Sequence, residues 1–352
     1  MCAVRKVFPS SVLSFSHASF HPPNMKSYVR FQHRLHASPS LIYLIFFIAV
    51  ATIWTFWEPL RRSWTLAAFE VIWSHNADDF VLSKLHDDFD VTMASYEQTQ
   101  TSAAPYEDKV PAILHHILLG NQNASTWKTE WTEARKSCLD LHPGWEAKLW
   151  TDDNAEEFVA KEFPDQLSVW KGYKYPVERV DSLRYMVLYH YGGAILDMDL
   201  RCTRALGPLR RFEFVAPEAF PRGLSIGFMM SAKGTKFMRD LVLNLSVYNK
   251  QWLGLPYATV MFSTGCHYAS TIHAYQTERS ELKILPGPLH SLNGRVQTPL
   301  FQHLGSSSWH SYDAKLLPKL SCYGRGLLAF GLLVAAVALV RRRIGLRKRI
   351  TM

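Results

Sequence analysis

Residues 177–200 read VERVDSLRYMVLYHYGGAILDMDL, and this stretch decides the fold. Its first half has the spacing of a helix. Val180, Leu183 and Val187 recur at positions i, i+3 and i+7, which places them on one apolar face. The glycine pair at 192–193 ends the helix, because glycine readily adopts the backbone conformation found just past helix C-termini. The stretch therefore predicts a helix that stops abruptly before a new element.

That new element is a short strand that ends in two acidic residues. Residues 194–196, Ala-Ile-Leu, form an apolar run that is too short for a helix and suits a buried strand. Asp197 and Asp199 follow, and side chains at i and i+2 of an extended segment point to the same side. Hard divalent cations prefer oxygen ligands and often join carboxylates to substrate phosphates. The pair predicts a metal site that neutralises charge on a diphosphate leaving group.

A D-x-D triplet alone is weak evidence, because a chain of this length contains about one by chance. Residues 88–90, Asp-Phe-Asp, form another such triplet in a polar stretch without a preceding buried strand. The helix, the glycine pair and the strand before Asp197 and Asp199 distinguish the two triplets. We therefore expect only the later one to bind a metal.

The order R-x-D-x-x-R-Y, Y-G-G and D-x-D resembles the sugar-binding region of glycosyltransferase family 32. The residues that carry the resemblance are Arg179, Asp181, Arg184, Tyr185, Tyr191, Gly192, Gly193, Asp197 and Asp199. The family includes fungal mannosyltransferases that act on inositol phosphorylceramide and on N-glycan outer chains. The resemblance covers roughly residues 110–315. It implies a GT-A-like, nucleotide-sugar-binding fold, and transfer of a hexose with retention of anomeric configuration.

The resemblance also implies roles for the acidic pair, which we expect to be catalytic. Asp199 would bind Mn²⁺ or Mg²⁺ directly, and Asp197 would contact the ribose or donor sugar and the hydrated metal. His303 begins a segment that resembles the family's late H-x-x-G-S-x-W element, and it would be a third metal ligand. Trp309 in that segment would form a wall for the nucleotide, with a membrane-surface anchor as the alternative.

A wider set of residues is expected to bind the donor: His116, Arg179, Asp181, Arg184, Tyr191, Gly193 and Trp309. His116 ends the first predicted strand, where the family places donor contacts; a structural histidine is the alternative. Arg179 and Arg184 suit a diphosphate, because a guanidinium pairs with phosphate oxygens in a fixed geometry. Asp181 lies three residues before Arg184, which predicts a salt bridge within the helix. In the family, such an aspartate also orients the arginine near the nucleotide.

Strands and helices alternate through residues 110–320, the expected catalytic domain. Strands are expected at 110–119 and 145–150, and helices at 125–141 and 151–170. This alternation predicts an α/β sandwich with a mostly parallel central sheet. Ligands bind beyond the carboxyl ends of the strands in such folds, and Asp197 and Asp199 follow a strand directly.

Two apolar runs, residues 41–57 and 326–340, predict transmembrane helices, although both are short for a span. A cleaved signal peptide or a buried helix is the alternative for the first run. Basic residues precede the first run and follow the second, which predicts cytosolic termini and a lumenal catalytic domain. We expect a multi-pass protein of the Golgi or ER membrane. Its remaining parts would be a disordered cytosolic tail at 1–40, a lumenal stem and linker at 58–109 and a basic cytosolic tail at 341–352.

The net charge of +9 comes from the two ends of the chain. Residues 1–40 contain five basic residues and no acidic residue, and residues 341–349 contain six more basic residues. These eleven positive charges exceed the net charge of +9, so the rest of the chain carries a slight net negative charge. That distribution argues against a nucleic-acid-binding surface.

Four of the five cysteines fall in the part of the chain expected to be lumenal, where disulfides can form. They are Cys138, Cys202, Cys266 and Cys322. Their spacing fits no zinc motif and leaves their pairing open, and buried free thiols are equally compatible. Glycosylation sequons begin at Asn123 and Asn244 and agree with this topology.

The acceptor is inferred from the architecture. A catalytic domain held between two membrane spans stays near the lipid surface, which favours a lipid headgroup such as inositol phosphorylceramide. The resemblance to fungal mannosyltransferases implies GDP-mannose as the donor, and a regulatory membrane subunit is a further candidate partner. The alternative is an α-1,6-mannosyltransferase of N-glycan outer chains, an enzyme type that usually has one N-terminal anchor. The chain departs from the family pattern at Thr264-Gly265-Cys266, usually Thr-Gly-Pro, and at residues 225–227, where an asparagine is common; both border the acceptor region by analogy.

Two other classes of protein share some of these features. Haloacid-dehalogenase-type phosphatases also have D-x-D at a strand end, but Leu200 and Arg201 stand where they expect Thr or Val, and no later acidic pair follows. A non-catalytic membrane subunit that kept the fold is the other alternative. Loss of activity in a folded Asp199→Ala protein would favour the enzyme.

Overall fold

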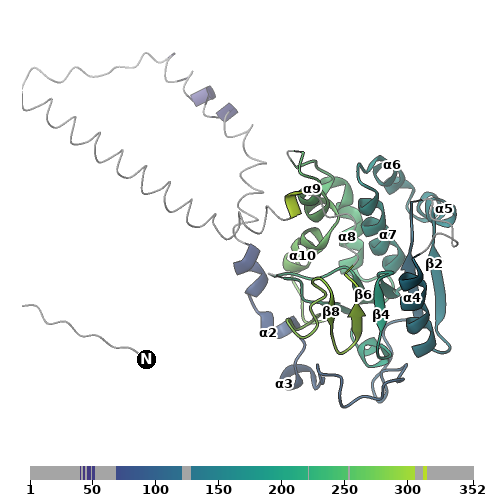
Figure 1. The fold of residues 1–352 in the computed structure, drawn as a ribbon. Coiled ribbons are helices and arrows are strands. Elements are labelled where there is room, and N and C mark those ends of the chain that lie inside the picture. The colour runs from purple at the N-terminus through teal and green to yellow at the C-terminus, as the bar shows by residue number, and fades with distance from the viewer. Residues whose placement is uncertain are drawn as a thin grey trace, which may run out of the picture. The chain divides into compact units, whose positions relative to one another are not determined.

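The protein is known here from a computed structural model. Apart from a few helical positions between 40 and 51, it describes residues 69–120, 128–220, 222–252, 254–305 and 312–314. The chain divides into two units, residues 1–64 and 65–352. The second unit contains all the strands described below, and Figure 1 shows its elements in chain order.

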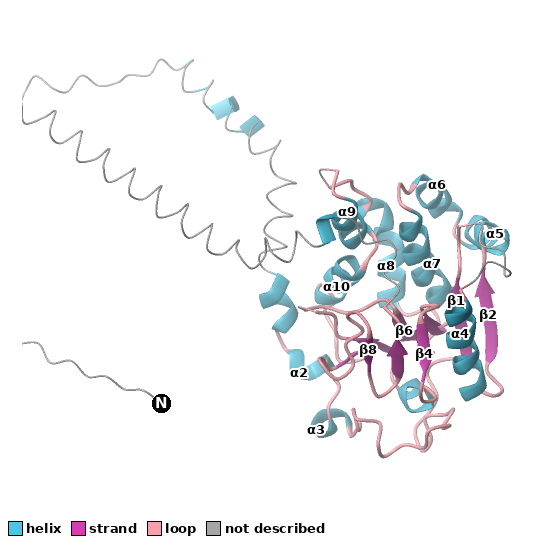
Figure 2. Ribbon diagram, in the orientation of Figure 1, coloured by secondary structure: helices cyan, strands magenta, loops and turns pink. Residues whose placement is uncertain are grey.

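Six strands form the central sheet, in the order β2-β1-β3-β6-β5-β7. They are β1 (Ile113–Ile117), β2 (Glu146–Trp150), β3 (Gly193–Leu196), β5 (Phe214–Pro217), β6 (Phe228–Ser231) and β7 (Leu282–Leu285). β1 is parallel to both β2 and β3, and β5 is parallel to β7. β6 runs antiparallel between β3 and β5. The predicted α/β fold with a mostly parallel sheet is therefore confirmed, with β6 as the exception (Figure 2).

A second, smaller sheet was not predicted from the sequence. It pairs β4 (Leu200–Cys202), β9 (Phe301–His303) and β8 (Val296–Gln297) in the order β4-β9-β8, all antiparallel. Two or three residues carry too little periodicity to reveal a strand. This sheet matters for function because β4 begins directly after Asp199.

The helices pack around these sheets. They are α2 (Ala77–Phe80), α3 (Lys84–Asp87), α4 (Thr129–Leu141), α5 (Asp152–Glu162), α6 (Pro164–Gly172), α7 (Pro176–Tyr191), the 3₁₀ helix η3 (Gly207–Arg211), α8 (Lys236–Tyr248), α9 (Pro256–Ser263) and α10 (Cys266–Ala274). The single helix expected at 151–170 is two helices. Pro164 occupies the first turn of α6, because proline lacks the N–H that would continue α5.

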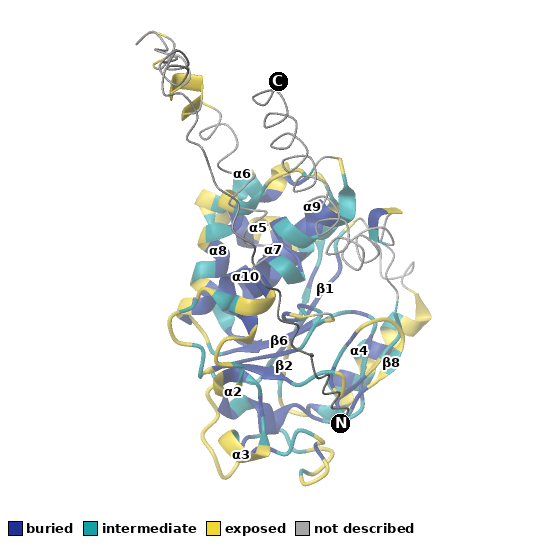
Figure 3. Ribbon diagram, turned by 90° about the vertical axis from the view of Figure 1, so that its left-hand side faces the viewer, coloured by how far each residue is buried: buried dark blue, intermediate teal, exposed yellow. Residues whose placement is uncertain are grey.

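Side chains of the central sheet point into two cores, one on each face. Ile195 of β3 packs in the core formed with α5, α6, α7, α8 and α10, whereas Ala194 and Leu196 pack in the core on the α4 side. All four residues of β3 are buried, as expected for a strand covered on both faces. Figure 3 shows this buried layer running through the sheet and the inner turns of the helices.

Helix α7 is the central helix of this unit. Pro176 takes its first position, and the Glu178 side chain accepts a hydrogen bond from the Tyr175 N–H at 3.0 Å. Gly192 ends it with φ +69°. We expected one apolar face, but every residue from Asp181 to Leu188 is buried, because the sheet and several helices surround α7. Its polar side chains therefore lie inside the protein, where they need partners.

Residues 69–109 do not behave as the stem and linker that we expected. Phe80, Leu82, Phe89 and Met93 are buried in the two cores. The Leu82 N–H donates to the Ile284 carbonyl at 2.9 Å, so this segment packs against β7.

The predicted membrane spans are not among the elements seen. In the described parts of the chain, we find no helix that combines the length and the apolar character needed to cross a bilayer. The expected span at 326–340 lies outside the described residues, and so does most of the one at 41–57.

Candidate functional site

A cleft of about 470 Å³ lies beyond the carboxyl ends of β1 and β3. Residues that follow β1 and β3 directly form part of its wall, including Leu118 and Asp197. This is where ligands bind in parallel α/β sheets. Among the predicted site residues, five line the cleft: Asp181, Arg184, Asp197, Asp199 and His303.

The helix and the strand of the opening stretch bring Arg184 and Asp197 together. From Tyr191 back to Arg184, the helix rises about 10 Å at about 1.5 Å per residue. From Gly193 to Asp197, the strand advances about 13 Å at about 3.3 Å per residue. Because the turn at Gly192 reverses the chain, both side chains reach the same end of the sheet.

Arg184 lies between two carboxylates. Its Nη2 forms an ion pair with Asp197 Oδ1, its Nε lies 3.7 Å from Asp181 Oδ1, and its Nη1 donates to the Ile226 carbonyl at 3.3 Å. Burial lowers the pKa of Arg184, but the two carboxylates raise it more, so the guanidinium stays charged. The salt bridge expected within the helix is thus present, and Asp197 extends it to the D-x-D segment.

Asp197 is held from its backbone and its side chain. Its N–H donates to the Gly227 carbonyl at 2.9 Å. Its Oδ2 lies against Gly227, where an added Cβ would be only 2.8 Å away. Burial raises the pKa of the Asp197 carboxyl, while Arg184 opposes that shift. Gly227 therefore provides the space that Asp197 occupies, a role that the sequence did not reveal.

Asp199 and His303 meet through the small sheet. Leu200 pairs with His303 in the β4–β9 register, and the Leu304 N–H donates to the Asp199 carbonyl at 3.0 Å. As a result, His303 Nε2 lies 3.3 Å from Asp199 Oδ2. Burial lowers the pKa of His303, but Asp199 raises it more.

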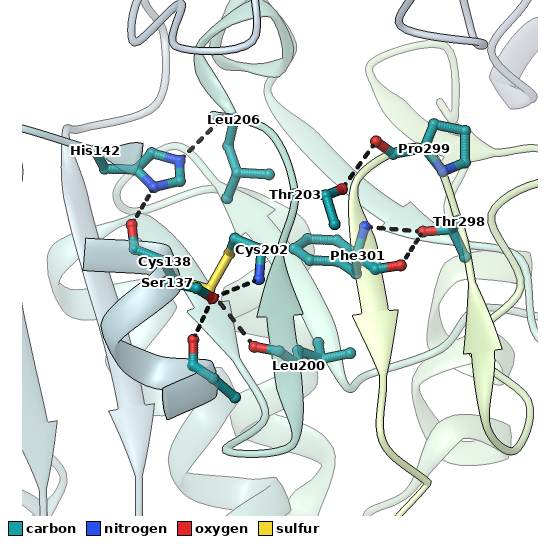
Figure 4. The surroundings of a disulfide bond; sticks show 11 residues. Ser137, Cys138, His142, Leu200, Cys202, Thr203, Leu206, Thr298, Pro299 and Phe301 are labelled. Carbon is teal, nitrogen blue, oxygen red and sulfur yellow. Dashed lines mark hydrogen bonds between the residues drawn. A yellow bond between two sulfur atoms is a disulfide. The ribbon is translucent and has the colours of Figure 1, made fainter. Parts of the chain in front are cut away.

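A disulfide between Cys138 and Cys202 fastens β4 to α4 (Figure 4). The Cys202 N–H also donates to Ser137 Oγ at 3.0 Å, and the Leu206 N–H donates to His142 Nε2 at 2.8 Å. The spacing of the cysteines had left this pairing open. These links fix the strand that follows Asp199.

Four residues expected at the donor site lie elsewhere. His116 is the next-to-last residue of β1 but does not line the cleft; it is fully buried, and burial lowers its pKa to about 3. The Arg179 guanidinium lies over the Trp170 ring. Tyr191 and Gly193 flank the turn before β3, at the opposite end of the strand from Asp197. The polarity of β3 explains the last two corrections, because the cleft is at the strand's carboxyl end.

Two other predicted features remain, Trp309 and the triplet at 88–90. Trp309 lies outside the described residues. The triplet at 88–90 forms no metal site with its neighbours: Asp88 pairs with Lys84, and Asp90 Oδ1 accepts a hydrogen bond from the Thr92 N–H at 3.0 Å. Both aspartates therefore stabilise the loop after α3.

Several residues that line the cleft carry no signal of it in the sequence. They are aromatic or apolar side chains such as Trp131, Phe220, Tyr257 and Met261. Only the departures from the family pattern, at 225–227 and at 264–266, signalled part of this wall. Packing across the fold brings the others in, and sequence periodicity does not report such contacts.

The donor atoms at the site fit a divalent metal in part. Within the described ranges, no three His, Cys, Asp or Glu side chains stand together as a complete metal-binding group. Asp199 and His303 supply one oxygen and one nitrogen side by side, whereas Arg184 engages Asp197 Oδ1. Asp199 and His303 are thus the better ligands, with Asp197 next to them.

Residues 128–215 match the model of a family described as "Glycosyltransferase sugar-binding region containing DXD motif". The resemblance inferred from the motifs is confirmed. Such a region implies a divalent metal in general, and both Asp197 and Asp199 fall inside it.

Curated relatives extend this similarity along the chain. Mannosyl phosphorylinositol ceramide synthase SUR1 of Saccharomyces cerevisiae is 35% identical over 68% of this chain and 63% of its own length. Inositol phosphoceramide mannosyltransferase 3 of Schizosaccharomyces pombe is 35% identical over 58% of this chain and 62% of its own length. Inositol phosphoceramide mannosyltransferase 1 of the same yeast is 28% identical over 73% and 81%. The chain thus spans less than two thirds of the first two relatives.

Proposed function

We propose that this protein is a metal-dependent mannosyltransferase that moves mannose from GDP-mannose to a lipid headgroup such as inositol phosphorylceramide. The observation that carries the proposal is the meeting of Asp197, Asp199, Arg184 and His303 in one cleft at the carboxyl end of β3. The names of the related yeast proteins supply the sugar and the acceptor. The central sheet and this cleft suit a GT-A-like fold, which forms part of the proposal.

The charge of the cleft explains why a cation would be needed. Among its described lining residues, Asp181, Asp197 and Asp199 oppose one arginine and one histidine. A donor diphosphate adds further negative charge, so it would be repelled without a counter-ion. Mn²⁺ or Mg²⁺ held by Asp199 and His303, with Asp197 beside them, would neutralise the leaving diphosphate.

The chain's own residues would orient the donor. Asp181 and Asp197 hold the Arg184 side chain in one conformation. Its remaining N–H groups therefore already have a fixed direction before the donor binds. Asp197, which directly follows β3, would contact the ribose or the sugar of the donor. In the transfer, the bond from the sugar's anomeric carbon to the diphosphate breaks, and a bond from that carbon to the acceptor oxygen forms. The acceptor's hydroxyl proton is released, and the family resemblance implies retention.

The aromatic and apolar part of the cleft suits an acceptor. Phe220, Tyr257 and Met261 line it, and Phe220 is 77% exposed. The acceptor would enter from a Golgi or ER membrane, with the catalytic domain in the lumen and the chain anchored by the apolar runs at 41–57 and 326–340. A regulatory membrane subunit would bind outside the cleft.

The proposal is tested with the full-length protein purified in detergent. It is incubated with Mn²⁺ or Mg²⁺, a panel of nucleotide sugars, and inositol phosphorylceramide or a mannose-terminated N-glycan as acceptor. We expect product with GDP-mannose and the lipid, loss of product with a chelator, and a retained anomeric centre. Product with the N-glycan alone would support the alternative acceptor, and no turnover with any pair would favour a non-catalytic subunit.

A further inference from the structure

The corner between α9 and α10 belongs to the cleft. Thr264 and Gly265 form this corner, and their N–H groups both donate to the Val260 carbonyl, at 3.0 and 2.8 Å. A Cβ on Gly265 would lie 3.1 Å from that carbonyl and from Met261 Cα, so a side chain there would be tightly packed. Met261, Gly265 and Cys266 face the cleft.

Thr264 connects this corner to the charged residues of α7. It is fully buried, and its hydroxyl donates to Asp181 Oδ2 at 3.2 Å. The other oxygen of the same carboxylate, Oδ1, lies 3.7 Å from Arg184 Nε. The Tyr185 hydroxyl donates to the Thr264 carbonyl, so the corner is held to α7 at two points. The Asp181 carboxylate is thus fixed from both sides.

This arrangement predicts how Arg184 would respond to a change at Thr264. A buried carboxylate oxygen that loses its donor must find another or remain unsatisfied. The Arg184 guanidinium is the donor closest at hand, because Asp181 Oδ1 already faces it. Turning toward Asp181 would draw Arg184 away from Asp197 and from the donor diphosphate.

We propose that Thr264 is a positioning residue: through Asp181 it sets the place of Arg184 relative to Asp197. The proposal rests on the proposed function, because it concerns the same donor site. Thr264 is part of a segment in which this chain departs from the family pattern at the third residue, Cys266. Thr264, the first residue of this segment, acts on Asp181 and Arg184, and Cys266, the third, lines the cleft.

The test compares Thr264→Val, which removes the hydroxyl and keeps the shape, with Thr264→Ser, which keeps the hydroxyl. We expect Thr264→Val to lower kcat/KM for the donor roughly 10- to 100-fold, in the range of direct couplings between neighbours. Thr264→Ser should stay within about 3-fold of the wild type. In an Asp181→Asn background, Thr264→Val should add less than about 3-fold, since the partner carboxylate is gone.

Thr271→Val is the matched control. Thr271 is also a buried threonine of this helix pair, but its hydroxyl donates to the His267 carbonyl at 2.8 Å and not to Asp181. Equal losses in Thr264→Val and Thr271→Val, failure of Thr264→Ser to restore activity, or full additivity with Asp181→Asn would overturn the proposal.

A second measurement needs no turnover. In a crystal structure of Thr264→Val, Arg184 should be displaced from Asp197, whereas an unchanged ion pair would contradict the proposal. If the wild-type protein transfers no sugar, the proposed function fails, but this structure still decides the role of Thr264.

Discussion

Arg184 and Asp197 form a partly buried ion pair, although Arg184 lies in α7 and Asp197 directly follows β3, which runs in the opposite direction. Asp181 lies on the other side of the same guanidinium. One cation thus holds two carboxylates at the cleft, next to the segment that carries Asp199. The pair links the stability of the fold to the geometry of the cleft.

Removing this cation should destabilise the protein strongly. Arg184→Ala leaves the buried Asp181 and the partly buried Asp197 without their partner, and we expect the free energy of unfolding to fall by about 3 kcal/mol. Arg184→Lys keeps the charge but loses the planar fork, so it should destabilise less while still impairing transfer. Urea denaturation at pH 7 measures both variants, and equal stability of the two would contradict this account of the pair.

Gly227 provides a test of the space around Asp197. An alanine at 227 would place its Cβ 2.8 Å from Asp197 Oδ2, so the carboxylate must move. We expect Gly227→Ala to lower kcat by about 100-fold, since displacements near 1 Å can cost that much. Gly172→Ala is the control, because a Cβ there meets nothing within 4 Å. Steady-state kinetics should separate the two variants; similar rates would refute the steric argument.

The disulfide between Cys138 and Cys202 closes a long loop, with a sequence separation of 64 residues. By chain entropy, a loop of this size contributes about 4 kcal/mol to stability. Reductant, or the double substitution Cys138→Ser with Cys202→Ser, should therefore lower the denaturant midpoint. Cys266→Ser should leave the response to reductant unchanged, because Cys266 has a free thiol. A midpoint that is indifferent to reductant would show that this bond does not form.

Buried histidines should make the fold sensitive to mild acid. His273 is fully buried, its Nε2 lies 2.9 Å from the Leu282 carbonyl, and burial lowers its pKa to about 3. The unfolded chain binds a proton near pH 6.5 and the folded chain does not, so stability is present above pH 6.5 and falls as pH decreases. This one group would remove about 3 kcal/mol between pH 7 and pH 4.5.

His273→Gln tests this contribution, because a glutamine N–H can still donate to the Leu282 carbonyl without titrating. Its free energy of unfolding should depend less on pH than that of the wild type between pH 4.5 and 7. Parallel pH profiles of the two proteins would rule out His273 as the cause.

The sequence predicted the parts of the site that depend on local signals. Helix periodicity, the glycine pair and the short apolar run define α7 and β3 without any information from distant residues. Their lengths then determine that Asp197 reaches the level of Arg184. The mostly parallel sheet followed from the alternation of strands and helices.

Contacts between distant segments could not be derived from the residues alone. Asp199 and His303 meet because β4 pairs with β9, and each strand has only three residues. Only the family resemblance suggested His303. Thr264 and Gly227 act through packing across the fold, which leaves no periodic trace. Tyr191 was misplaced because a motif does not state which end of a strand faces the ligand.

The most direct test of the central claim is sugar transfer by the Asp199→Asn protein. Purified full-length wild type, Asp199→Asn and the exposed control Asp88→Asn are compared with GDP-mannose, inositol phosphorylceramide and Mn²⁺ or Mg²⁺. The account predicts transfer by the wild type and the control, and a loss of more than about 100-fold in kcat for Asp199→Asn, with its folding preserved. Transfer by Asp199→Asn at the wild-type rate would contradict it.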